Sequence, residues 1–202
     1  YMEVAGMSCD FVGHPIVSEL VPSNQEIRLF RGALGIDRDT PIVSVLPGSR
    51  QNEIMRMMPI YLKAIALVAG EYPNLIFVIA SPPNVFDLVK KFLKTTNVPI
   101  IQLCERDDPL KFEESKRMLF STSLAAIATS GTVTLELARM GAPILVGYRA
   151  SFFTEILLKN FVNLKSATLI NLLTKNEAIP ELLFSKCTYK NISSSLISLL
   201  TN

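Results

Sequence analysis

Two glycine turns carry the residue types in this sequence that are best suited to binding chemistry. The first, Gly48-Ser49-Arg50, follows the apolar run Ile42 to Leu46 and precedes a stretch with helical periodicity. The backbone amides of such a turn and the positive end of the following helix favour an anion. Arg50 adds a fixed charge whose planar fork matches phosphate oxygens. The pattern predicts a phosphate site, although glycine turns at strand-to-helix junctions also occur as ordinary structural turns.

The second turn, Ser130-Gly131-Thr132, has the same setting between an apolar run and a helical stretch. Glu136 follows four residues after Thr132, so both lie on one face of the predicted helix. A carboxylate is poorly suited to phosphate, but it can accept hydrogen bonds from a vicinal diol such as that of a ribose. An ordinary glutamate favoured by the positive end of the helix dipole would give the same pattern.

Two further pairs of side chains are expected at the ends of strands. Tyr148 and Arg149 follow the apolar run ILVG and would add an aromatic ring and a cation to the same crevice, or form an exposed loop pair. Gly13 and His14 lie in a turn at the end of a short apolar stretch, where a ligand could approach. His14 is the only histidine, and a lone histidine is more often a packed or surface residue.

The sequence contains no convincing metal site. The Asp-Arg-Asp motif at 37–39 has a spacing that some sugar-transferring enzymes use to hold a divalent metal. It precedes a predicted strand instead of following one, so we interpret it as a solvated connector. Cys9, Cys104 and Cys187 are odd in number and widely spaced, which argues against both a zinc site and a disulfide framework and fits a reducing cytosol.

These candidate residues require a scaffold in which several strands end at one edge, and the sequence predicts such a scaffold. Apolar runs and helical stretches alternate along most of the chain, as in a Rossmann-like three-layer αβα sandwich with a mostly parallel sheet and right-handed crossovers. One stripe recurs at helical spacing: Ile54, Met58, Tyr61, Ile65 and Val68. Pro59 interrupts that helix, which therefore kinks or restarts there. Ligands of such sheets bind beyond the carboxyl ends of the strands, where both glycine turns fall.

The predicted elements cover most of the chain. Strands are expected at 9–15, 42–46, 74–80, 98–103, 124–128 and 142–146, with an extended stretch at 167–170. Helices are expected at 24–36, after the turn at 48–50, and at 85–94, 108–120, 133–140, 152–161 and 188–200.

Length and composition narrow the class of protein. The 202 residues suffice for one sizeable domain, and 49% of them are hydrophobic while 19% are charged. No apolar run approaches the roughly 20 residues of a membrane-spanning helix, so only peripheral membrane contact remains open. The net charge is +2 and the basic residues are scattered, so the sequence shows no basic cluster of the kind that binds nucleic acid.

Five segments together resemble the lipid A disaccharide synthase family, which are GT-B glycosyltransferases (family 19) of the bacterial outer-membrane lipid pathway. The segments occur in the order and spacing of that family: FVGHP at 11–15, LPGSRQNEI at 46–54, TSGTVTLELA at 129–138, APILVGYR at 142–149, and NLL at 171–173 with IPELL at 179–183. The resemblance covers nearly the whole chain. Members of the family are longer, and this chain is similar to their second, donor-binding half.

The resemblance implies an inverting transfer of 2,3-diacylglucosamine from UDP-2,3-diacylglucosamine to 2,3-diacylglucosamine 1-phosphate. The product would be a β-1,6 disaccharide, with release of UDP. On this basis residues 1–202 form a single UDP-binding domain that lacks the N-terminal acceptor domain, with its general base, and the extreme C-terminus. The isolated chain is then expected to bind UDP without catalysis.

The resemblance also assigns roles to individual residues. Donor binding is implied for both turns and the strand ends: Gly48, Ser49, Arg50, Ser130, Gly131, Thr132, Glu136, Tyr148 and Arg149. Arg50 and Asn171 match positions implicated in activity, and Gly13 and His14 are further candidates. Because amides and an arginine would neutralise the diphosphate, neither a metal nor another cofactor is required.

The expected partners are the UDP-sugar donor and, through the missing half, a monosaccharide lipid acceptor of the lipid X type. The implied location is cytoplasmic and peripheral on the inner membrane, and association into a homodimer is left open. Two alternatives remain. One is another GT-B enzyme that uses a UDP-sugar, such as a UDP-N-acetylglucosamine epimerase or the peptidoglycan glycosyltransferase. The other is a nucleotide-binding or assembly module without catalysis.

Overall fold

Six strands form one sheet in which every neighbouring pair is parallel. The computed structural model describes residues 6–8, 10, 13–103, 108–129, 131–150, 166–174 and 177–201. The strands lie in the order β3-β2-β1-β4-β5-β6. Their bounds are β1 Ile42–Leu46, β2 Ile76–Ile79, β3 Ile100–Gln102, β4 Ala125–Thr129, β5 Ile144–Tyr148 and β6 Glu181–Leu183. The predicted α/β fold is confirmed, and the sheet, predicted to be mostly parallel, is parallel throughout.

The strand order places β1 and β4 side by side in the middle of the sheet. Val43 of β1 pairs with Phe77 of β2 on one side and with Ala125 of β4 on the other. The chain winds outward in one direction through β2 and β3 and in the other through β5 and β6. Such a switch point opens a crevice beyond the carboxyl ends of the two central strands. The two glycine turns of the sequence follow these two strands.

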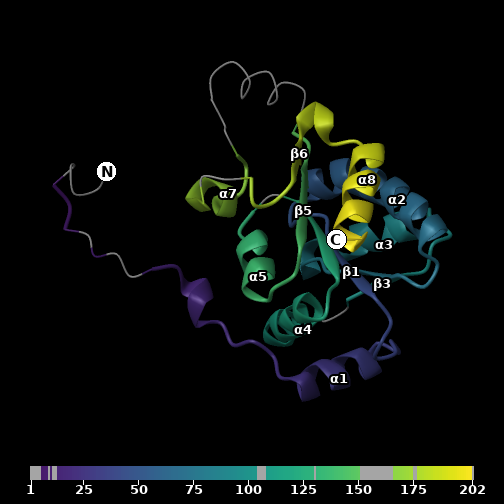
Figure 1. Ribbon diagram of the computed structural model, residues 1–202, viewed down its shortest axis with the longest axis horizontal. Coiled ribbons are helices and arrows are strands. Elements are labelled where there is room, and N and C mark those ends of the chain that lie inside the picture. The colour runs from purple at the N-terminus through teal and green to yellow at the C-terminus, as the bar shows by residue number, and fades with distance from the viewer. Residues whose placement is uncertain are drawn as a thin grey trace.

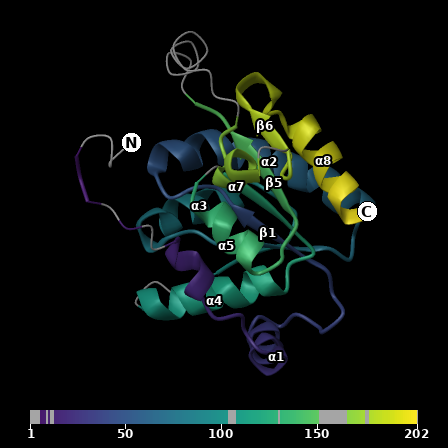
Figure 2. The same ribbon diagram turned by 60° about the vertical axis from the view of Figure 1, so that its left-hand side comes forward.

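Helices cover both faces of the sheet, which confirms the three-layer prediction. The helices are α1 Asn24–Ala33, α2 Gln51–Glu71, α3 Phe86–Leu93, α4 Pro109–Ser121, α5 Val133–Arg139, α7 Leu169–Thr174 and α8 Tyr189–Thr201, with short 3-10 helices η2 Pro15–Ser18, η3 Pro83–Val85 and η4 Phe184–Lys186. Helices α2, α3 and α8 pack on one face and α4 and α5 on the other, with α1 outside α4 (Figures 1 and 2). Strand β1 serves both cores, since Val43 and Val45 join the first cluster and Ile42 and Leu46 the second.

Helix α2 begins directly at the first glycine turn and carries the predicted apolar stripe. All members of the stripe are fully buried: Ile54, Met58, Tyr61, Ile65 and Val68. Pro59 lies inside this one continuous helix, so of the two predicted alternatives, a kink or a restart, the restart is excluded. The surrounding turns pack against the sheet, and this burial offsets the hydrogen bond that a proline cannot donate.

Tyr61 connects α2 to the neighbouring strands β4 and β5 through its side-chain hydroxyl. Its hydroxyl lies 3.1 Å from Thr129 Oγ1 of β4 and donates to the Gly147 carbonyl of β5 at 3.1 Å. Burial raises the pKa of the Tyr61 phenol, which keeps it protonated as a donor. A Cβ atom at Gly147 would lie 3.2 Å from this hydroxyl, so the absence of a side chain there allows the close approach.

The predicted strands and helices between residues 24 and 148, and the final helix, match the structure to within a few residues. The described part of the segment 9–15 contains no strand, and Pro15–Ser18 is a 3-10 helix. The extended stretch predicted at 167–170 is wrong, because α7 begins at Leu169. The short strand β6 has no counterpart in the prediction. The helix predicted at 152–161 lies outside the described residues.

Candidate functional site

A cavity of about 530 Å³ lies beyond the carboxyl ends of β1 and β4, at the switch point of the sheet. Its walls come from the turn after β1, the loop after β2, helix α4, and the turn after β4 with the start of α5. Six residues predicted for donor binding line it: Gly48, Ser49, Arg50, Gly131, Thr132 and Glu136. Ser130 lies outside the described residues. The sequence predicted both glycine turns at the carboxyl ends of strands, and the fold brings them to one cavity.

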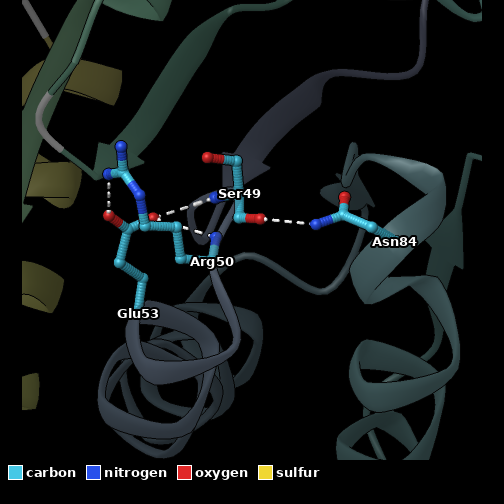
Figure 3. Close-up of polar contacts among 4 residues, drawn as sticks. All are labelled: Ser49, Arg50, Glu53 and Asn84. Atoms are coloured by element: carbon cyan, nitrogen blue, oxygen red, sulfur yellow. Dashed lines mark hydrogen bonds and ion pairs between the residues drawn. The ribbon is translucent and has the colours of Figure 1, made fainter.

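The amides of the first turn bond to a carboxylate from the same chain. Ser49 N and Arg50 N donate to Glu53 Oε2 at 3.0 and 3.2 Å, and Arg50 Nη1 donates to Glu53 Oε1 at 2.9 Å (Figure 3). Glu53 is one helical turn into α2, and its side chain is 16% exposed, whereas that of Arg50 is 80% exposed. The turn amides therefore hold an anionic group of the chain itself, at the positive end of helix α2. The role of Glu53 was missed by the sequence reasoning.

The conformation of this turn requires a glycine. Gly48 has φ 111°, a region that side chains disfavour, and a Cβ there would lie 2.6 Å from Glu53 Oε2. The opposite side of the turn is held by Asn84, whose Nδ2 donates to the Ser49 carbonyl at 3.0 Å (Figure 3). The turn is thus fixed from both sides, by α2 and by η3.

The second turn contributes small residues to the facing wall. Gly131 and Thr132 line the cavity, and Thr129 lies at its base. Thr134 Oγ1 donates to the Gly131 carbonyl at 2.9 Å and so closes the first turn of α5.

Glu136 of α5 lines the cavity, as predicted, and forms an ion pair with a lysine that the sequence reasoning missed. Lys116 Nζ of α4 lies 2.8 Å from Glu136 Oε2 and 2.6 Å from Glu113 Oε2. Burial lowers the pKa of Lys116, but the bonds to Glu113 and Glu136 outweigh it and hold that pKa above its usual value. The only sequence signal was local, because Glu113 precedes Lys116 by one helical turn.

The charges that line the cavity are mixed. Among the described lining residues, two side chains are cationic and three are anionic: Arg50 and Lys116, against Glu53, Glu113 and Glu136. Steering by a positive field therefore does not characterise this cavity. An anion would depend on local donors, namely the turn amides and the exposed guanidinium of Arg50.

Tyr148 and Arg149 are not among the residues that line this cavity. Tyr148 ends β5, one strand away from β4, and its ring meets Phe184 edge-on at a centroid distance of 6.4 Å. Arg149 is exposed. Gly13 and His14 do not line the cavity either. His14 Nδ1 accepts from Ile16 N at 3.1 Å and caps η2.

Asn171 is buried and bonded within the chain. Its Nδ2 donates to the Ile179 carbonyl and to Glu181 Oε1, both at 2.8 Å, and its Oδ1 accepts from Ile179 N at 2.9 Å. The amide therefore joins α7 to the segment that leads into β6. It does not line the cavity at the switch point.

Glu181 is the centre of a second polar cluster around this joint. Its carboxylate accepts from Ala167 N at 2.8 Å, Thr168 Oγ1 at 2.6 Å and Thr168 N at 3.1 Å, and it also bonds to Ser166 Oγ. Burial raises the pKa of Glu181, but these donors more than compensate and lower it overall. The cluster holds α7 and β6 together and belongs to the scaffold.

The Asp-Arg-Asp motif at 37–39 lies before β1, at the opposite edge of the sheet from the cavity. Arg31 of α1 is buried and donates to the carbonyls of Asp37 and Thr40, which fixes this connector. Within the described part of the chain, no group of three or more His, Cys, Asp or Glu side chains is arranged to hold a metal. In that same part, no helix is both long and apolar enough to cross a membrane.

The family model described as lipid-A-disaccharide synthetase matches residues 1–202. A lipid-A-disaccharide synthase from Ruegeria pomeroyi is 34% identical over 97% of this chain and 49% of its own length. One from Rickettsia bellii is 33% identical over the whole chain and 50% of its length. A probable lipid-A-disaccharide synthase, mitochondrial, from Arabidopsis thaliana is 35% identical over 96% of this chain and 44% of its length. The chain thus spans about half the length of these relatives.

Solved structures share the fold at low sequence identity. E. coli ADP-heptose LPS heptosyltransferase II superimposes with a TM-score of 0.63 at 13% identity, over 91% of this chain and 53% of that one. The UDP-GlcNAc 2-epimerase from Neisseria meningitidis gives a TM-score of 0.55 at 20% identity, over 86% of this chain and 40% of that one. The fold resembles one domain of GT-B glycosyltransferases.

Proposed function

The chain belongs to the lipid-A-disaccharide synthase family, and from that premise we propose that it is the half of the enzyme that binds the UDP-sugar donor. One observation supports this proposal above the others. The two glycine turns line one cavity at the switch point of a parallel sheet, and ligands of such sheets bind there. The proposed domain comprises residues 1–202, and the acceptor domain and the general base are assigned to the other half of the enzyme.

The donor diphosphate lies, in this proposal, against the turn at 48–50. The Ser49 and Arg50 amides bond to the Glu53 carboxylate in the structure, so a diphosphate that uses them replaces that carboxylate. The guanidinium of Arg50 is largely exposed and has several N–H donors, of which one bonds to Glu53. The guanidinium therefore has free space and further N–H donors with which to bind the diphosphate. Gly131 and Thr132 form the opposite wall, and the preceding Ser130 is assigned to the diphosphate from the sequence alone.

Glu136 accepts the ribose hydroxyls in this assignment. Its position in the cavity supports this role, because a carboxylate bonds well to a vicinal diol and is repelled by phosphate. Tyr148, Arg149, Gly13 and His14 are assigned to the donor side from their predicted places at strand ends and from the family resemblance, and Asn171 from the resemblance alone. The bonds that Asn171 makes to Ile179 and Glu181 support a positioning role for it, between α7 and β6.

The proposed reaction is an inverting transfer of 2,3-diacylglucosamine. The 6-hydroxyl of 2,3-diacylglucosamine 1-phosphate attacks the anomeric carbon of the donor from the face opposite the diphosphate. The new C–O bond forms as the bond to the diphosphate breaks, and the hydroxyl proton passes to the general base. Negative charge grows on the departing UDP, where the turn amides and Arg50 stabilise it. Each such donor is typically worth about 2.7–4 kcal/mol of the barrier.

The partners and location follow from the same premise. The donor is UDP-2,3-diacylglucosamine, and the lipid acceptor is bound through the other half. The complete enzyme works in the cytoplasm, peripherally at the inner membrane. This chain alone binds UDP and transfers no sugar.

Isothermal titration calorimetry with UDP tests the donor site. We expect measurable binding to this chain and a loss of about 100-fold or more in the double variant Arg50→Ala/Glu136→Ala, because hydrogen bonds to charged groups are worth about 1.5–3 kcal/mol each. Arg38→Ala/Glu71→Ala is the matched control, since both residues are exposed and neither lines the cavity. Absence of binding, or equal affinity in the two double variants, would refute the donor-site assignment.

A further inference from the structure

Lys116 is a largely buried cation that joins two helices at the wall of the cavity. It lies on α4, its side chain is 12% exposed, and it contacts Glu136 of α5 through the 2.8 Å ion pair. Glu113 holds the same ammonium from the other side, at 2.6 Å, and the Phe112 ring lies 5.9 Å from it. Burying an ammonium is unfavourable unless it is paired. The two carboxylates supply that pairing and fix the place of Lys116.

We propose that Lys116 is a positioning residue, which holds the Glu136 carboxylate in the orientation that accepts the two ribose hydroxyls of a uridine nucleotide. This inference rests on the proposed donor site. It assigns Lys116 no contact with the nucleotide, so its effect on binding passes entirely through Glu136.

The ion pair leaves Glu136 able to accept a diol. A carboxylate has about four acceptor positions on its two oxygens, and Lys116 uses Oε2. The second oxygen and the remaining lone pairs suffice for two hydroxyl donors. Lys116 holds the Glu136 side chain in one conformation. A glutamate that is already fixed loses less rotamer freedom when a ligand binds, so the entropy cost of binding is smaller.

Lys116 also allows the carboxylates of Glu113 and Glu136 to lie close together at the cavity wall. Glu113 and Glu136 both contact its ammonium, so their oxygens are separated by little more than that group. Without the cation the two charges would repel, and Glu136 would turn away from Glu113 towards water. The carboxylate would then remain in the cavity but would lose its fixed orientation towards the ribose.

The test compares the affinities of UDP and 2′,3′-dideoxy-UDP for the same variant. The ratio of the two dissociation constants measures only what the ribose hydroxyls contribute, because losses of charge or stability affect both ligands alike. For this chain we expect UDP to bind about tenfold or more tightly than the dideoxy analogue, the effect of one hydrogen bond to a charged group. Calorimetry on the wild-type chain, Lys116→Met, Glu136→Gln and the exposed control Lys91→Met supplies the four ratios.

The proposal predicts that Lys116→Met lowers the ratio by about threefold or more, towards the value for Glu136→Gln. Lys91→Met should leave the ratio unchanged, and Lys116→Arg, which retains the cation, should preserve most of it. If circular dichroism shows that Lys116→Met does not fold, Lys116→Gln keeps a hydrogen-bond donor and serves in its place.

Two results would overturn the proposal while the donor site stands. In one, UDP binds and Lys116→Met weakens both ligands equally, so that the ratio is unchanged and Lys116 acts on charge or stability alone. In the other, the wild-type chain binds UDP and its dideoxy analogue equally, so the ribose hydroxyls are not recognised through Glu136. If the wild-type chain binds neither ligand, the proposed donor site fails and this inference fails with it.

Discussion

Replacing Glu53 by alanine is expected to weaken the fold and to strengthen UDP binding. The Glu53 carboxylate accepts from Ser49 N, Arg50 N and the Arg50 guanidinium at 3.0, 3.2 and 2.9 Å. In the proposed donor site, the diphosphate needs the same two amides. Glu53 therefore stabilises the turn and competes with the ligand for it, so its removal should have opposite effects on stability and affinity.

The magnitude follows from the two amide bonds. Losing a side chain that satisfies the first amides of a helix costs about 1 kcal/mol, within a range of about 0.5–2 kcal/mol. The ion pair with Arg50 adds little, because the guanidinium side chain is 80% exposed. For a chain of this size, a loss of about 1–2 kcal/mol lowers Tm by about 2–8 °C. Since UDP no longer has to displace the carboxylate, its dissociation constant should fall by about 5- to 30-fold.

Thermal unfolding by circular dichroism and titration calorimetry with UDP measure the two effects. Glu53→Gln keeps an acceptor oxygen without the charge, and we expect intermediate values for it. Glu71→Ala is the matched control, because it removes the same charge from the far end of the same helix. Weaker UDP binding by a folded Glu53→Ala chain would refute the reasoning. It would show that Glu53 holds the turn in its binding conformation and does not occupy the place of the ligand.

Three further predictions concern the scaffold of the site. Gly48→Ala should lower the free energy of unfolding, measured in urea titrations, by about 1–3 kcal/mol, because φ is 111° and the new methyl would lie 2.6 Å from a carboxylate oxygen. Gly70 lies inside α2 with open space around it, so the control Gly70→Ala should instead raise the free energy of unfolding by up to about 1 kcal/mol. Tyr61→Phe should cost about 1–3 kcal/mol, since its partners Thr129 and a strand carbonyl stay buried, and a change below about 0.5 kcal/mol would contradict that account. The lowered pKa of Glu181 stabilises the fold above the ordinary pKa of a carboxyl group, and this contribution is lost as pH falls through the lowered value. Urea midpoints from pH 7 to pH 3 should therefore fall more steeply in the wild-type chain than in Glu181→Gln.

The sequence predicted the elements around the cavity because their signals are local. The buried stripe on α2 is set by helical periodicity, and the run Ile42 to Leu46 by the burial of both faces of a central strand. The short strand β6 was missed because three half-buried residues carry no periodic signal. The extended stretch expected at 167–170 was wrong because the polar cluster around Glu181 and Asn171 determines that segment through contacts distant in the sequence.

The residues of the candidate site could likewise be predicted from the sequence only in part. The glycine turns at strand ends and the carboxylate of Glu136 could be recognised from neighbours in the sequence, and the structure places them at one cavity. The partner of Glu136 could not, since Lys116 lies on a different helix and reaches Glu136 only because α4 and α5 pack on the same face of the sheet. The bonds from the turn amides to Glu53 were also missed, although these residues are only three and four positions apart. Hydrophobic periodicity predicts which residues are buried, but it does not predict the hydrogen-bond partners of a polar side chain.

The sequence by itself determined the α/β class, the position of the two turns at strand ends, and the family. The tertiary structure decided that β4 lies beside β1, which makes the two turns one cavity, and that the polar side chains around it are paired with each other. The physical reason is the range of the interactions involved. Backbone conformation and burial follow from residues a few positions apart, whereas strand order and ion pairs between helices depend on the packing of the whole chain.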